Sequence, residues 1–219
     1  MIEIKDIAYW YENKDNPLFE NVNLVFEKGK SYAIVGRSGS GKTTFLSLIA
    51  GMDKPKSGEI LYEGEAINKI GLTHYRNKDV SIIFQSYNLF TYMSALENLM
   101  TAMVITGASH SGDREYAIEM LKKVGIDEET AKKNVQHLSG GQQQRVAVVR
   151  TMCCDARLVV ADEPTGNLDE ANTKEIIELL QDLAKSQGKC VIIVTHEPDV
   201  AQMCDVQYVL KDRQFQIIN

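Results

Sequence analysis

The chain has 219 residues, of which 44% are hydrophobic and 25% charged, an ordinary composition for a soluble protein and a length that suits one α/β domain with a smaller subdomain. Its formal net charge of −6 argues against a protein whose main role is to grip nucleic acid, because phosphate backbones need a basic face. The stretch from Met1 to Asp6 is too charged for a signal peptide, and no apolar run approaches the roughly 18 to 20 residues of a membrane span, so we expect a chain that does not cross a membrane.

The first 26 residues predict an antiparallel β subdomain. Apolar residues alternate with polar ones from Ile2 to Ile7 and from Val22 to Phe26, and a period of two is typical of half-buried strands. A polar turn that ends at Pro17 separates the two runs. Tyr9 and Tyr11 are expected to share one face of the first strand, because side chains alternate between faces.

The next segment predicts a strand, a glycine-rich loop and a helix. Residues Ser31 to Val35 form a short apolar run that is typical of a buried strand, and Thr44 to Ala50 has helical character. A turn follows at Pro55 to Gly58, and Glu59 to Tyr62 predicts another short strand.

A mainly helical segment is predicted from about Ala95 to Thr151. Leu96, Leu99 and Met103 recur at helical spacing, which predicts one apolar face. Methionines at 93, 100 and 103 indicate core packing, with a groove that receives a partner helix as the alternative.

Strands and helices alternate again after residue 157. Leu158 to Ala161 and Val191 to Val194 are apolar without alternation, and a helical apolar pattern from Ile176 to Leu183 lies between them. Such strands favour a parallel sheet that is covered on both faces. The last stretch, Val206 to Ile218, predicts a closing hairpin.

The strongest local motif is a phosphate-binding loop, Gly36-Arg37-Ser38-Gly39-Ser40-Gly41-Lys42-Thr43. It matches G-x-x-x-x-G-K-[ST] and has the required strand before it and helix after it. Glycines let several backbone N–H groups point into one concavity, and the helix N-terminus favours a phosphate. Lys42 would meet the β- and γ-phosphates, and Thr43 would offer its hydroxyl to Mg²⁺.

Two adjacent carboxylates follow the apolar strand that begins at Leu158. Asp162 and Glu163 lie at its carboxyl end, where open α/β sheets bind ligands. Asp162 is the candidate Mg²⁺ ligand, and Glu163 is the candidate base that polarises a water molecule. Alone, this pattern could be a solvated strand end; beside the phosphate loop it favours a P-loop nucleotidase.

A second anion-binding element is predicted at Leu138-Ser139-Gly140-Gly141-Gln142. A serine hydroxyl followed by two glycines at a helix start can bind a phosphate. A simple N-cap by Ser139 is the alternative and can hold at the same time, but it leaves the second glycine unexplained.

Together these motifs resemble the ATP-binding-cassette (ABC) family over essentially the whole chain. Leu138 to Gln142 is identical to its signature motif. Gln85 resembles the Q-loop glutamine, Gly166-Asn167-Leu168-Asp169 the D-loop, and His196 the switch histidine. Tyr11 lies where the family places an aromatic ring that stacks on adenine.

Within the family, residues 161–169 and 84–89 most resemble the branch of lipoprotein-release, macrolide-efflux, antimicrobial-peptide-export and cell-division ATPases. The segment 151–157 departs from the family by lacking the usual proline before the carboxylate strand, which should affect packing more than chemistry.

The resemblance implies an α/β P-loop NTPase (RecA-like) fold, with a mostly parallel sheet, an antiparallel β subdomain and a helical signature subdomain. The whole of 1–219 is then one nucleotide-binding domain, with the core and β subdomain at about 1–92 and 156–219 and the helical subdomain at about 93–155.

The resemblance also implies the ligands, ATP and Mg²⁺, and the residues that contact them. Catalysis is assigned to Glu163, His196, Lys42 and Gln85, and the metal to Thr43, Gln85 and Asp162. The nucleotide-binding set is Tyr11, Gly36, Arg37, Ser38, Gly39, Ser40, Gly41, Lys42, Thr43, Thr44, Ser139, Gly140, Gly141, Gln142 and Asp169.

The implied machine is a head-to-tail dimer in which Ser139 and Gly141 of one copy close over ATP held by the other. It couples to an integral membrane permease, which we expect to dock around Gln85 to Leu96 and to hold the chain at the cytoplasmic face of the plasma (inner) membrane. No nucleic acid partner is expected.

Two alternatives remain. One is a soluble ABC ATPase that acts on ribosomes or DNA, although the chain has neither a coiled-coil insertion nor a second cassette. The other is a non-hydrolysing binding module, which the intact Lys42, Glu163 and His196 oppose. The four cysteines form no C-x-x-C pair and favour reduced, buried thiols in a cytoplasmic protein.

Overall fold

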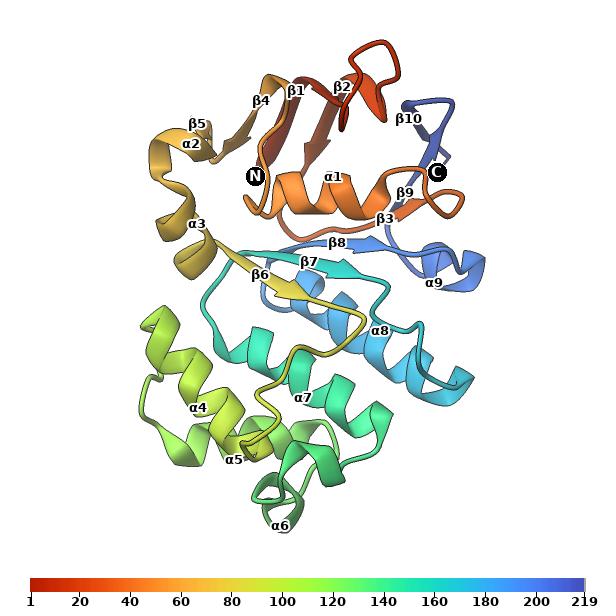
Figure 1. Ribbon diagram of the computed structural model, residues 1–219. Coiled ribbons are helices and arrows are strands. Elements are labelled where there is room, and N and C mark those ends of the chain that lie inside the picture. Colours follow the sequence, from red (N-terminus) through yellow and green to blue (C-terminus); the bar gives the residue numbers. More distant parts are fainter. Residues whose placement is uncertain (219) are drawn as a thin grey trace.

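A six-stranded sheet runs through the middle of the molecule in the computed structural model, which describes residues 1–218 (Figure 1). The strand order is β10-β9-β3-β8-β7-β6, and every pair is parallel except β9 with β10. The strands are β3 (Ser31–Val35), β6 (Val80–Ile83), β7 (Leu158–Asp162), β8 (Cys190–Val194), β9 (Val206–Lys211) and β10 (Gln214–Ile217).

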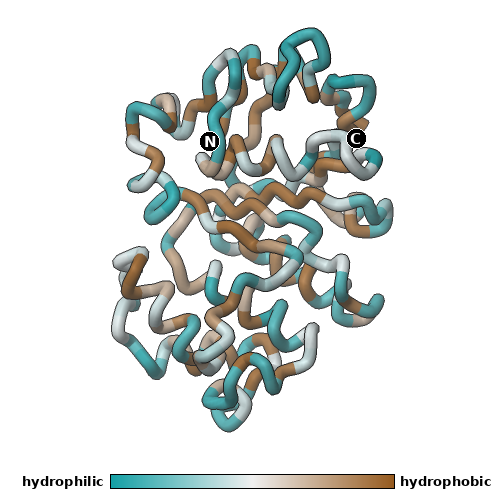
Figure 2. The backbone as a smooth tube through the Cα atoms, in the orientation of Figure 1, coloured by the Kyte–Doolittle hydropathy of each residue, from teal (hydrophilic) through white to brown (hydrophobic). Residues whose placement is uncertain are grey.

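Side chains of the central strands alternate between two separate hydrophobic cores. In β7, Leu158 and Val160 pack into the core on one face, and Val159 and Ala161 pack into the core on the other. All four are fully buried. The continuous apolar runs therefore belong to strands covered on both faces, as predicted, and Figure 2 shows them as a band of hydrophobic backbone through the centre.

A second, antiparallel sheet covers one face of the first. Its order is β2-β1-β4-β5, with β1 (Ile2–Tyr9), β2 (Phe19–Phe26), β4 (Ser57–Tyr62) and β5 (Glu65–Ala66). Helix α1 (Lys42–Ile49) lies between the two sheets (Figure 1), and its Phe45, Leu48 and Ile49 are fully buried there. Two short helices, α2 (Ile67–Ile70) and α3 (Leu72–Lys78), lead from this sheet to β6.

The other face of the central sheet is covered by helices. Helices α8 (Glu170–Lys185) and α9 (Pro198–Gln202) pack on it directly. Between β6 and β7 the chain forms a helical region with its own core, made of α4 (Ala95–Thr106), α5 (Arg114–Lys123), α6 (Glu128–Ala131), the 3-10 turn η1 (Val135–His137) and α7 (Gly140–Cys153). None of the helices within residues 1–218 combines the length and apolar character needed to cross a bilayer.

One local expectation needs correction. Strand β1 ends at Tyr9, so Tyr9 and Tyr11 do not share a strand face: Tyr9 is buried and donates its hydroxyl to Asp53 at 2.6 Å, whereas Tyr11 is exposed in the following loop. The predicted closing hairpin is confirmed as β9 and β10, and β9 also pairs in parallel with β3. Of the three methionines, only Met103 is fully buried.

Candidate active site

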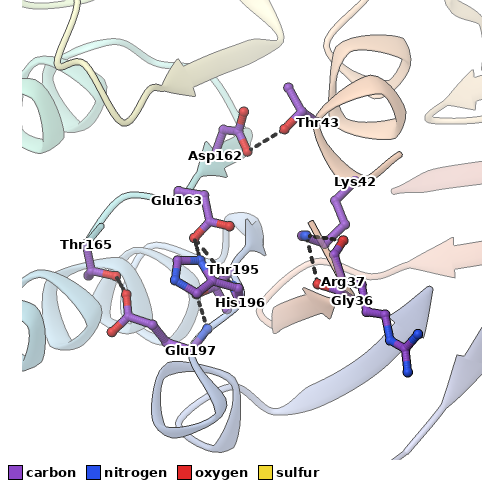
Figure 3. A network of polar contacts seen from close by, with 10 residues as sticks. All are labelled: Gly36, Arg37, Lys42, Thr43, Asp162, Glu163, Thr165, Thr195, His196 and Glu197. Carbon is purple, nitrogen blue, oxygen red and sulfur yellow. Dashed lines mark hydrogen bonds and ion pairs between the residues drawn. The ribbon is translucent and has the colours of Figure 1, made fainter. Parts of the chain in front are cut away.

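Three loops meet where the parallel strands β3, β7 and β8 end. The strands are paired in register, so their carboxyl ends lie at one edge of the sheet. Each strand leads into candidate functional residues. These are the loop Gly36 to Thr43 after β3, Asp162 and Glu163 at the end of β7, and His196 after β8. Figure 3 shows these side chains facing a common space.

Glycine is required at two positions of the phosphate loop. Gly41 has a φ of 106°, and a Cβ there would lie 2.6 Å from the side chain of Leu18. A Cβ on Gly36 would lie 2.8 Å from the carbonyl oxygen of Leu210. The backbone can follow this path only without side chains at these points.

Two buried polar groups of the loop indicate what that ligand is. The Lys42 ammonium donates to the carbonyl oxygens of Gly36 and Arg37 at 2.9 and 3.2 Å, and the residue is only 7% exposed. The Ser40 hydroxyl is buried without a hydrogen-bond partner among the described residues. A buried hydroxyl without a partner is costly, and a phosphate oxygen would satisfy it.

Asp162 and Thr43 offer two oxygens to a metal ion. The Thr43 hydroxyl donates to the Asp162 carboxylate at 3.2 Å. Burial raises the pKa of Asp162 above its ordinary value, the Thr43 hydrogen bond offsets part of this, and the Glu163 charge raises it further. A hydroxyl beside a carboxylate that lacks a strong cationic partner fits Mg²⁺, which prefers hard oxygen ligands.

Glu163 and His196 form the opposite side of the site. The His196 Nδ1 lies 2.8 Å from Glu163 Oε2. Glu163 itself has a φ of 47°, a left-handed conformation that is uncommon outside glycine and often marks functional positions. The pair can hold a water molecule or a phosphate oxygen between a carboxylate and an imidazole.

The cavity at this edge has a volume of about 1060 Å³. It is lined by residues 36–40, Lys42, Thr43, Glu163 and His196, among others. An adjacent cavity of about 500 Å³ is lined by Tyr11 and shares Gly39 and Ser40 with the first. Tyr11 is 66% exposed, and its hydroxyl is hydrogen-bonded to that of Thr44 at 2.7 Å. An exposed ring beside a phosphate loop is well placed to stack on a base.

Gln85 does not reach this cavity in the structure. Its side-chain nitrogen lies 2.9 Å from where a Cβ on Gly166 would be, and its carbonyl oxygen accepts from Asn167 at 3.1 Å. No hydrogen bond joins it to Thr43 or Asp162. The Gln85 side chain therefore rests against the 163–169 loop.

The signature residues also lie away from the cavity. Ser139 is the N-cap of α7 and forms a capping box with Gln142, so the simple N-cap interpretation holds. None of Ser139 to Gln142 is among the described residues that line the cavity. Asp169 similarly caps α8 through the amide of Asn172. Neither the signature residues nor Asp169 line the cavity of their own chain.

The residues of the far wall of the Tyr11 cavity are not predicted from the sequence. Asp212 and Arg213 from the β9–β10 turn line it, and Arg213 donates to Asn16 at 2.7 Å. Arg213 and Asn16 are 197 positions apart in the sequence, so no local motif predicts this contact.

The sequence is similar to those of several known proteins. A family model described as "ABC transporter" matches residues 19–166. The chain is 54% identical over 217 residues to the uncharacterized ABC transporter ATP-binding protein YclH of Bacillus subtilis, covering 99% of this chain and 96% of that protein. It is 39% identical over 206 residues to the macrolide export ATP-binding/permease protein MacB of Hyphomonas neptunium, covering 92% of this chain but 32% of MacB.

A solved structure shares the whole fold. The dimeric structure of the cassette MJ0796, a protein of Methanocaldococcus jannaschii, superposes with a TM-score of 0.87 at 35% identity, covering 99% of this chain and 97% of the other. A second MJ0796 structure, of a post-hydrolysis state bound to ADP and Pi, has the same TM-score. The predicted P-loop fold, with its parallel core and antiparallel subdomain, is confirmed.

Proposed function

The chain belongs to the ABC transporter family and is an ATPase, and from this premise we propose that it powers a membrane transport or mechanotransmission complex. It works as a dimer of two copies, with ATP and Mg²⁺, bound to a separate permease. Each part of this proposal rests on a different feature of the chain.

The division of the phosphate-binding elements supports a dimer. Residues 36–40, Lys42 and Thr43 line the cavity, whereas Ser139 to Gln142 begin α7 in the helical region (Figure 1). Both elements present helix N-terminal amides, which favour anions. If copies pair head to tail, the signature residues of one cover ATP bound to the other, and the ligand then stabilises the pair. The dimeric structure of MJ0796 supports a pair of cassettes.

The metal is assigned to Thr43 and Asp162, whose oxygens are 3.2 Å apart. When bound, Mg²⁺ would neutralise charge on the β- and γ-phosphates. Lys42 adds a fixed positive charge beside the same phosphates. Gln85 is proposed to approach the metal when nucleotide binds, which requires its side chain to leave the contact with Gly166.

Hydrolysis is assigned to Glu163 and His196. The Glu163 carboxylate would accept a hydrogen bond from the attacking water and so orient it towards the γ-phosphate. His196 lies 2.8 Å from that carboxylate and can donate to the γ-phosphate as negative charge shifts on its oxygens. Loss of the shared phosphate then removes the ligand that holds the two copies together.

A groove between the helical region and the central sheet is the proposed permease site. Phe90, Ala102 and Ile105 give it apolar walls, and Arg76 and Arg150 also line it. Burial lowers the pKa of Arg150, so this guanidinium would gain from an anionic partner. The groove fits a short amphipathic helix that carries an acidic residue.

The partner and its location are inferred from relatives. MacB is named an ATP-binding/permease protein, and this chain matches only about a third of its length. By analogy with these relatives, we infer that this chain serves a partner permease and is peripheral, at the cytoplasmic face of the plasma membrane.

The test uses a Glu163→Gln variant, which should bind ATP and hydrolyse it slowly. It is purified from its native cells with ATP and mild detergent, and co-purifying proteins are identified. A polytopic membrane protein is the expected result. Ribosomal or chromosomal proteins with no membrane protein would overturn the transporter assignment and favour the soluble alternative.

A matched pair of variants locates the docking surface. Ile105 and Val104 are neighbours on α4 and are equally exposed, at 60% and 61%, but Ile105 lines the groove and Val104 is not among its lining residues. Ile105→Asp in the Glu163→Gln background should lose the membrane protein, and Val104→Asp should keep it. Equal retention by both would place the permease elsewhere.

A further inference from the structure

The side chain of Asn172, on the first turn of α8, joins two elements that both lie outside the cavity of their own chain. Its carboxamide oxygen accepts from Arg145 Nη1 on α7 at 2.8 Å. Its carboxamide nitrogen donates to both carboxylate oxygens of Asp169, each at 2.9 Å. Asn172 is half-buried between them.

A carboxamide suits this position. The group must accept from the Arg145 cation on one side and donate to the Asp169 anion on the other, which no carboxylate or ammonium can do. The neighbours therefore fix which end of the carboxamide is the oxygen. The amide N–H of Asn172 also donates to Asp169, and the pKa of Asp169 is lowered, chiefly by this backbone hydrogen bond and then by the side chain.

The same carboxamide lies directly against the signature loop. A Cβ on Gly141 would lie 2.6 Å from the Asn172 oxygen and 2.9 Å from its carboxamide carbon. Contact this close explains why the second position of the Gly-Gly pair has no side chain, which N-capping by Ser139 does not explain. The signature loop and the Asp169 loop are thus packed on one side chain.

We propose that Asn172 is a positioning residue that holds the signature loop and the Asp169 loop of one copy at a fixed spacing, so that both engage the partner copy together. The proposal rests on the proposed function, in which Ser139 and Gly141 cover ATP on the second copy. A side chain that touches neither ATP nor Mg²⁺ would then control how well two copies close.

The first measurement is ATP-driven dimerisation in the Glu163→Gln background, followed by analytical ultracentrifugation. Asn172→Ala should raise the dimer dissociation constant by about tenfold or more, since it removes hydrogen bonds to two charged groups. ATP affinity of the monomer should stay within about twofold, because Asn172 is not among the residues that line the cavity.

Asn172→Asp separates positioning from simple anchoring. It keeps the size and the contact with Arg145, but it replaces the donor to Asp169 by an oxygen that repels it. If Asn172 only anchored Arg145, this variant would behave as the parent. The proposal expects it to dimerise as poorly as Asn172→Ala.

The control is Glu175→Ala. Glu175 is the other partner of Arg145 Nη1, at 2.9 Å, but its side chain is 60% exposed, and exposed ion pairs contribute little. This variant should dimerise within about twofold of the parent. A tenfold defect here, or none in the two Asn172 variants, would overturn the proposal.

Hydrogen exchange of the monomer tests the link without any dimer. Asn172→Ala and Asn172→Asp should speed amide exchange in both 139–145 and 166–172, while β7 and β8 keep their protection. Unchanged exchange in both segments would sink the proposal. If the Glu163→Gln parent itself fails to dimerise with ATP, the proposed function fails, and exchange still decides whether Asn172 joins the two loops.

Discussion

At the scale of single residues, Glu163 is the most unusual position of the site. It has a φ of 47°, and a non-glycine residue held in the left-handed region costs about 1–3 kcal/mol. Two contacts hold it there: its amide donates to the Val194 carbonyl at 2.9 Å, and its carboxylate meets His196. In this conformation the carboxylate lies beside His196, in the cavity that the phosphate loop also lines.

Replacing Glu163 by glycine and by alanine should measure this strain. Both variants lose the carboxylate, so both should lose hydrolysis by about 10²-fold or more. Glycine tolerates the left-handed conformation and alanine does not, so Glu163→Gly should be more stable than Glu163→Ala by about 1 kcal/mol. That corresponds to about 2–4 °C in melting temperature for a chain of this size, measured by calorimetry without nucleotide. Equal melting temperatures would mean that the backbone is not strained.

At the scale of elements, strands β3 and β9 are joined at their starts by a polar link. The Ser31 amide and hydroxyl both donate to Asp205 Oδ2, at 2.8 and 2.7 Å, and the Asp205 amide donates back to the Ser31 hydroxyl at 3.1 Å. Ser31 is fully buried. Burial alone would raise the pKa of Asp205, but the two hydrogen bonds from Ser31 and nearby lysines hold it below its ordinary value.

This link predicts a pH-dependent contribution to stability. Because the pKa of Asp205 is lower in the folded state, its contribution is present above the unfolded pKa of about 3.9 and is lost as pH falls through the folded pKa. Asp205→Asn should cost about 1 kcal/mol at pH 7 in urea unfolding, and the cost should shrink as the pH is lowered from about 5 towards 3. A cost that is independent of pH would assign the effect to packing.

Elements that depend on local sequence patterns can be predicted from the sequence. Pairings that depend on contacts between distant residues cannot. The loop from Gly36 to Thr43 and the strand ending at Asp162 can be predicted from the sequence, because residue type and spacing are enough to identify them. The pairing of β9 with β3 is invisible locally, since 174 positions separate Ser31 from Asp205. Gln85 is recognised by its motif, but its contact with Gly166 depends on how two loops pack.

At the scale of the whole molecule, three hydrophobic cores share elements. One lies between the two sheets, one within the helical region, and one between the central sheet and α8. Helix α7 belongs to two of them: Val146 and Val149 pack in the helical core, and Val148 packs under the sheet. A helix with residues in both cores should make them unfold together, because neither can lose it alone.

The cysteines allow this to be tested, since each core contains one. Cys190 lies in the core between the sheets, Cys153 in the helical core and Cys204 in the core beneath the central sheet. Burial raises the pKa of each of these thiols to about 12, against about 8.5 in an unfolded chain. At pH 8 each thiol should therefore react with iodoacetamide only where its core has opened.

Pulse labelling across a urea series, read by mass spectrometry of each peptide, should give one midpoint for Cys153, Cys190 and Cys204. Coincident midpoints are expected of a cooperative, two-state transition, and here the shared helix α7 supplies the physical reason. A lower midpoint for Cys153 would show that the helical region opens as a separate unit. In that case the boundaries near residues 93 and 155 would mark an independent subdomain, and its free movement against the core would have to be restrained by ATP or by the permease.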